Sequence, residues 1–110
     1  MMSNFVELVP GDFDKEVIAN SKSKPVLVDF MANWCGPCKL VAPIFKALSE
    51  DFTDQVKFVK VDTDVHEDTV DKYNIQGLPL FALFVNGKVK ATHSGALTKD
   101  NLKAFITKNM

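Results

Sequence analysis

The feature that most constrains this chain is the pentapeptide Trp34-Cys35-Gly36-Pro37-Cys38, which holds its only two cysteines. Because there is no third cysteine, the two either close on each other or bind a ligand together. A run of apolar residues at 26–31 ends just before the motif and is typical of a buried strand. Apolar residues at helical spacing follow it, so the pattern predicts a strand, the motif and a helix in direct succession. The apolar positions of that helix are Val41, Ile44, Phe45 and Leu48.

This order places Cys35 at the N-terminus of the predicted helix. Unpaired backbone N–H groups and the helix dipole favour a negative charge there. Such a position lowers the pKa of a thiol, and the thiolate is the reactive species. Cys38 lies one helical turn further on and on the same face. The sequence therefore predicts a dithiol that can open and close.

Composition indicates a globular protein. The 110 residues, 46% hydrophobic and 25% charged, are expected to form a single domain over residues 1–110. A net charge of −1 gives no electrostatic reason to expect nucleic acid or membrane binding. No apolar stretch approaches ~20 residues, and the first residues lack the features of a secretory or transit leader. We therefore expect a cytoplasmic protein, in a reducing compartment where C-x-x-C is catalytic or metal-binding rather than structural.

The apolar pattern alternates strands and helices. Strands are expected at 5–9, 26–31, 56–62, 79–85 and 88–93, the last two joined by the hairpin signal Asn86-Gly87. Helices are expected around 13–18, at about 35–52 with a kink at Pro43, at about 65–73, and after Thr98. The order predicts an α/β fold, with a central mixed sheet of about five strands covered by helices on both faces.

These residues together make the chain resemble the thioredoxin family over nearly its whole length. C-x-x-C alone is a modest signal, whereas W-C-G-P-C with an upstream strand-borne Asp and a downstream G-x-P is very specific. The matching positions are Asp29, 34–38, Pro43, Lys60, Gly77-Leu78-Pro79, Asn86-Gly87 and Gly95-Ala96. Met31 and Leu80 depart from the commonest family pattern, which puts packing beneath the site and target preference in question.

The resemblance implies a role for each residue of the dithiol site. Cys35 would be the nucleophile that attacks a target disulfide, and Cys38 would resolve the mixed disulfide. Asp29 would exchange a proton with Cys38, and Lys60 would lie near Asp29 and modulate it. The sequence by itself leaves another reading open, in which Asp29 and Lys60 are solvated strand residues.

The resemblance also implies an apolar rim around Cys35 that binds substrate. Pro79 would be a cis proline, and the backbone of Leu78 would pair with an extended substrate segment. From the residues alone, Pro79 only starts a strand, and the alternative for Trp34 is a simple core residue. The implied substrate-binding residues are Trp34, Gly36, Pro37, Leu78, Pro79, Gly95 and Ala96.

The family resemblance implies a protein-disulfide reductase, a thiol–disulfide oxidoreductase with no bound cofactor. Electrons would pass from NADPH through a thioredoxin reductase to reductases, peroxidases and oxidised protein thiols, and we expect a monomer. His66 and His93 lack zinc-ligand spacing with the cysteines, so no metal is expected.

Two alternatives share the fold. A disulfide-forming or isomerising enzyme usually has a histidine between its cysteines, whereas Gly36-Pro37 supplies no charge to stabilise the thiolate, which favours a reductant. A non-catalytic binding module would not be expected to keep both cysteines and Asp29.

Overall fold

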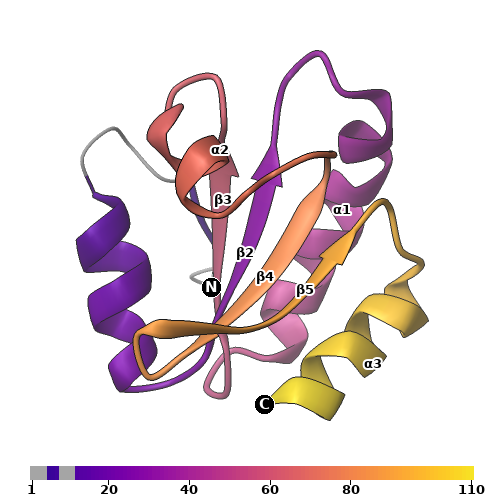
Figure 1. Cartoon of the computed structure of the whole chain (residues 1–110). Coiled ribbons are helices and arrows are strands. Elements are labelled where there is room, and N and C mark those ends of the chain that lie inside the picture. The colour runs from indigo at the N-terminus through magenta and orange to yellow at the C-terminus, as the bar shows by residue number, and fades with distance from the viewer. Residues whose placement is uncertain (1–4, 8–11) are drawn as a thin grey trace.

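A five-stranded mixed sheet forms the centre of the computed structural model, which describes residues 5–7 and 12–110 (Figure 1). The strands lie in the order β1-β3-β2-β4-β5. Strands β1 and β2 both run parallel to β3, whereas β4 is antiparallel to β2 and β5 is antiparallel to β4. The mixed sheet predicted from the sequence is thus confirmed. The strands are β1 (Phe5–Glu7), β2 (Val26–Met31), β3 (Lys57–Asp62), β4 (Leu80–Val85) and β5 (Lys88–Ser94).

Helical segments cover both faces of this sheet. One face packs against η1 (Asp14–Ala19) and the residues around α2 (Asp68–Lys72), and the other packs against α1 (Gly36–Asp51) and α3 (Lys99–Asn109). Thr98 accepts a hydrogen bond from the backbone N–H of Asn101 and so caps α3, as predicted. Among the described residues, no helix is both long and apolar enough to cross a bilayer.

Strand β2 is buried along its whole length, which explains its continuous apolar run. Successive side chains of a strand point to opposite faces, so Val26, Val28 and Phe30 pack in one core and Leu27 packs in the other. Asp29 is two residues from Leu27 and therefore points to the α1 face. The same alternation brings Asp29 toward the helix that carries Cys38.

Two helices differ from the sequence prediction. The helix expected at 65–73 is shorter, since α2 covers only Asp68–Lys72 and a separate turn precedes it, in which the Asp62 carbonyl accepts the backbone N–H groups of Val65 and His66. The first helix forms as a wide π-helical turn, η1, followed by a 3-10 turn, η2 (Asn20–Lys22). There the Asn20 side chain donates to the Lys15 carbonyl, five residues back.

The remaining elements differ only at their ends. Helix α1 starts at Gly36 and continues through Pro43, and β4 starts at Leu80 rather than Pro79. Of the strand predicted at 5–9, residues 8 and 9 lie outside the described residues.

Candidate active site

Cys35 occupies the N-cap position of α1, as its place between β2 and the helix predicts. It is joined to Cys38 by a disulfide, with the two Cα atoms 5.3 Å apart. The backbone N–H of Cys38 donates to Cys35 Sγ at 3.2 Å. This N–H belongs to the first turn of α1. Such a donor stabilises a thiolate more than a thiol, which favours the reactive form of Cys35 once the disulfide opens.

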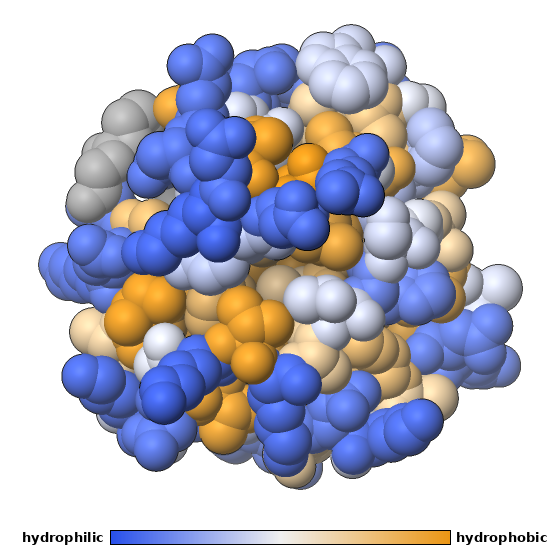
Figure 2. Space-filling view, in the orientation of Figure 1, coloured by the Kyte–Doolittle hydropathy of each residue, from blue (hydrophilic) through white to orange (hydrophobic). Residues whose placement is uncertain are grey.

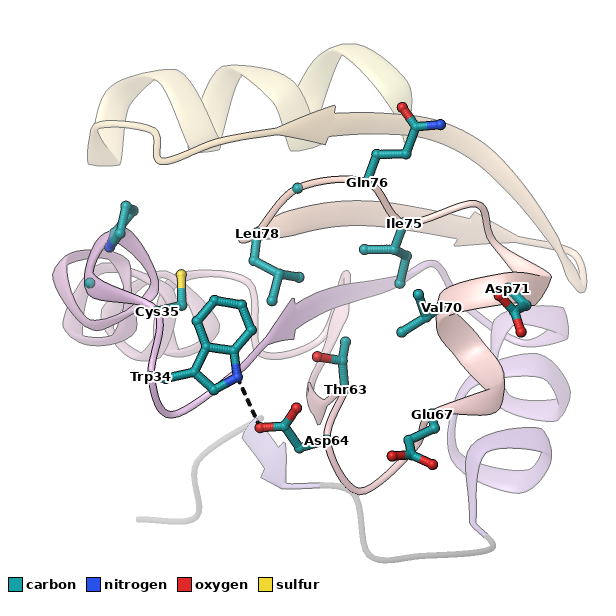
Figure 3. Close-up of a pocket in the computed structure, with 13 residues that line it drawn as sticks. Trp34, Cys35, Thr63, Asp64, Glu67, Val70, Asp71, Ile75, Gln76 and Leu78 are labelled. Atoms are coloured by element: carbon teal, nitrogen blue, oxygen red, sulfur yellow. Dashed lines mark hydrogen bonds between the residues drawn. The ribbon is translucent and has the colours of Figure 1, made fainter.

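The two sulfurs face different surroundings. Cys35 lines a groove of about 750 Å³ that runs from the dithiol toward α2 (Figure 3). Cys38 is 3% exposed and instead lines a separate cavity of about 80 Å³ beneath the dithiol. Cys35 therefore borders the open groove, whereas Cys38 borders the smaller cavity.

Trp34 forms one wall of the groove. Its side chain is 71% exposed, and its indole N–H donates to Asp64 Oδ2 at 3.1 Å. The alternative that Trp34 is a core residue is therefore wrong. Leu78 also borders the groove, and Figure 3 shows both side chains beside Cys35. In the orientation of Figure 1, the molecular surface shows apolar residues exposed between hydrophilic ones (Figure 2).

Asp29 lies in the small cavity beside Cys38 and is only 2% exposed. Its Oδ1 has no hydrogen-bond partner among the described residues. Burial raises the pKa of Asp29 from 3.8 to about 7, and the positive charge of Lys60 offsets part of that rise. Lys60 is the register partner of Asp29 on β3 and lines the same cavity. The reading of Asp29 as a solvated strand residue is therefore wrong.

The predicted rim is only partly brought together by the groove. Trp34, Gly36, Pro37 and Leu78 line it. The Leu78–Pro79 peptide bond is cis, and the Pro79 carbonyl accepts the N–H of Gly95. Pro79 and Gly95 thus adjoin the groove through Leu78, and Ala96 is exposed next to Gly95.

Sequence reasoning missed the opposite wall of the groove. That wall comes from the end of β3, from α2 and from the loop after α2. It consists of Thr63, Asp64, Glu67, Val70, Asp71, Ile75, Gln76 and Gly77. One signal was available, because five carboxylates fall between positions 62 and 71. Within the described ranges, no three His, Cys, Asp or Glu side chains are grouped so that they could hold a metal ion.

Comparisons with known proteins agree with this geometry. The family model described as Thioredoxin matches residues 4–108. The chain is 38% identical over 110 residues to a thioredoxin of Pseudomonas aeruginosa, covering 100% of both chains. It is 42% identical over 106 residues to a thioredoxin of Acidithiobacillus ferridurans, covering 96% of each.

A solved structure is also similar. It is that of Malassezia sympodialis thioredoxin (Mala s 13), with a TM-score of 0.85 and 34% sequence identity. The match covers 98% of this chain and 92% of that one.

Proposed function

Because this chain belongs to the thioredoxin family and is a thiol–disulfide oxidoreductase that reduces protein disulfides, we propose that its two cysteines divide the reaction between them. The observation that carries the proposal is their different surroundings. Cys35 lines the open groove, whereas Cys38 lines the inner cavity that also holds Asp29. These surroundings support a role for Cys35 in attacking the target and a role for Cys38 in exchanging a proton inside the protein.

In the first step, the Cys35 thiolate attacks one sulfur of a target disulfide. A Cys35–target bond forms, the target S–S bond breaks, and the other target sulfur leaves as a thiolate that takes up a proton. The backbone N–H of Cys38 favours this step, because it donates to Cys35 Sγ and stabilises the attacking thiolate.

In the second step, Cys38 loses its proton and attacks Cys35 Sγ. The Cys35–Cys38 disulfide forms, the Cys35–target bond breaks, and the second target sulfur leaves as a thiolate. Two electrons have then passed from the dithiol to the target. We assign the Cys38 proton to Asp29, because burial raises the pKa of this carboxyl to about 7, where it can both take and release a proton at neutral pH. Lys60 modulates this exchange, since its charge lowers the pKa of Asp29.

Membership of the family implies a thioredoxin reductase and protein disulfides as partners. We further propose that the targets include reductases and peroxidases, with NADPH as the source of electrons through the reductase. A reducing dithiol suits the cytoplasm, which we propose as the compartment. We also propose that residues 1–110 work as one domain and as a monomer.

The test is reduction of insulin disulfides by NADPH and a thioredoxin reductase. We expect turbidity from the freed insulin chains, together with NADPH oxidation that depends on this protein. The variant Cys35→Ser is the matched control and should support neither. If the native chain leaves insulin intact while an established thioredoxin reduces it in the same mixture, the assignment of this chain as a protein-disulfide reductase fails.

A further inference from the structure

The groove beside Cys35 carries charge of one sign. Its charged lining side chains are Asp64, Glu67 and Asp71, and within the described residues no lysine, arginine or histidine lines it. Asp64 holds Trp34 through a hydrogen bond. The Glu67 and Asp71 side chains are exposed, and neither forms an ion pair with a residue that the structure describes. Two carboxylates on the groove wall are therefore open to a cation from outside.

The charge around these two residues is not balanced locally. Residues 62–72 contain five carboxylates and one lysine, a net charge of −4 in a chain whose total is −1. A groove with low-dielectric walls and charge of one sign concentrates its field on whatever enters it. The near-neutral total hides this asymmetry, which is why composition gave no indication of it.

The part of the groove between the dithiol and the carboxylates is apolar. Val70, Ile75 and Leu78 are half-buried and line it. Figure 3 shows Cys35 toward one end, these apolar side chains in the middle, and Glu67 and Asp71 toward the other end. The volume of about 750 Å³ lies within the range of ~300–1,000 Å³ found for ligand-binding sites.

We propose that this groove selects target disulfides flanked by basic residues. The occupant is an extended segment of the target protein that places its disulfide at Cys35 and a lysine or arginine near Glu67 and Asp71. A long basic side chain matches such a site, because its alkyl stem covers apolar surface while its charged end meets the carboxylates. The inference rests on the proposed role of Cys35, and it names the target chemistry that the reaction favours.

The experiment compares three synthetic peptides, each with one intramolecular disulfide and with identical tails on both sides. The tails contain four lysines, four serines or four glutamates. Pre-reduced protein is mixed with each peptide, the reaction is quenched with acid, and the freed peptide dithiol is measured by mass spectrometry. Reduction of each peptide by dithiothreitol gives its intrinsic reactivity, and the rate measured with the protein is divided by this value.

We expect the lysine peptide to react about three- to tenfold faster than the glutamate peptide at low salt, with the serine peptide between them. At 1 M salt, where screening acts over about 3 Å, the ratio should approach one.

Two variants separate the groove from general surface charge. In Glu67→Gln combined with Asp71→Asn, the lysine-to-glutamate ratio should fall to within about twofold of one. The control removes two exposed carboxylates elsewhere, Glu50→Gln with Asp54→Asn, and should keep the native ratio. Glu50 lies fifteen residues beyond Cys35 near the far end of α1, which is about 22 Å at 1.5 Å per residue.

The outcomes are distinct. Equal normalised rates for the three peptides, a preference for glutamate tails, or the same loss of preference in both double variants would overturn the inference and leave the reductase function standing. Failure to reduce any of the three peptides would overturn the role of Cys35 and the inference with it.

Discussion

Asp29 gives the sharpest test of the site, because burial makes it costly as well as useful. The substitution Asp29→Asn keeps the size of the side chain and removes its charge. Burial raises the pKa of Asp29 from 3.8 to about 7. At ~1.36 kcal/mol per pKa unit, ionising this carboxyl within the fold costs roughly 4 kcal/mol. The Asn amide in the same dry cavity offsets about 1–3 kcal/mol of this gain in stability, because its own hydrogen bonds are not formed there. We expect the Asp29→Asn variant to be about 1–3 kcal/mol more stable than the native chain at pH 8.

The pH range in which Asp29 lowers the free energy of unfolding follows from its two pKa values. Below pH 3.8 the carboxyl is protonated in both the folded and the unfolded state, and there is no cost. Between 3.8 and about 7 the unfolded chain releases this proton while the folded protein keeps it, so the free energy of unfolding falls as pH rises. Above about pH 7 both states are ionised and the cost is constant. The advantage of Asp29→Asn should therefore grow from pH 4 to 7 and then level off.

Urea unfolding of the oxidised proteins from pH 4.5 to 9 measures this difference. Oxidised protein is used because a free Cys38 thiol would add a second titrating group. If the free energy of unfolding falls by ~1–3 kcal/mol per molar urea, the urea concentration at the unfolding midpoint should be roughly 1 M higher for the variant at pH 8. Asp54→Asn removes an exposed carboxyl and should show no such pH-dependent gain. A variant less stable than the native chain at pH 8, or a native stability that stays flat from pH 5 to 8, would refute the reasoning. In parallel, resolution of the mixed disulfide should slow by up to ~10²-fold, because Cys38 loses its proton acceptor.

Three further predictions concern the site and the core. Cys38→Ser should accumulate covalent adducts with targets, whereas Cys35→Ser should form few or none; equal accumulation by mass spectrometry would contradict the assigned roles. Pro37→His places a potential cation beside the thiolate and should make the couple more oxidising in equilibration with glutathione, and an unchanged or lower potential would contradict this electrostatic argument. Phe45 is 1% exposed and its ring centroid lies 5.0 Å from that of Phe58. Phe45→Ala should lower the free energy of unfolding by about 3–5 kcal/mol in urea, and a loss below about 1 kcal/mol would mean that the site collapses around the gap.

The sequence was sufficient to predict the main strands and helices, because the spacing of apolar residues reflects which face of each element is buried. Strand β2 is covered on both faces, so its apolar run is continuous and predictable. The helical spacing from Val41 to Leu48 places one face of α1 on the sheet, and the structure buries both residues there. Cys35 at the helix N-cap follows from these two elements alone.

The far wall of the groove could not be predicted in the same way. Val70 and Ile75 line the same groove as Cys35 only because β3 lies beside β2 in the sheet, which places α2 across the groove from Trp34. Periodicity reports which face of an element is buried, but it does not report which other element borders that face. The shortened α2 was missed because residues 62–66 form a separate turn before it, closed by the Asp62 carbonyl, and apolar spacing does not distinguish such a turn from the start of a helix.

Asp29 interrupts the apolar run of the buried strand β2, and this interruption marks the candidate site. An apolar residue there would continue β2 and add to the core, whereas the carboxyl has an oxygen with no hydrogen-bond partner among the described residues. The dry surroundings that make its ionisation costly are the same ones that bring its pKa to about 7. A carboxyl exposed to water at this point would cost nothing, and it would hold no proton at neutral pH to return to Cys38 when the disulfide reopens. The stability lost at Asp29 and the proton exchange that we propose there therefore have one physical cause, so a substitution that restores the first should remove the second.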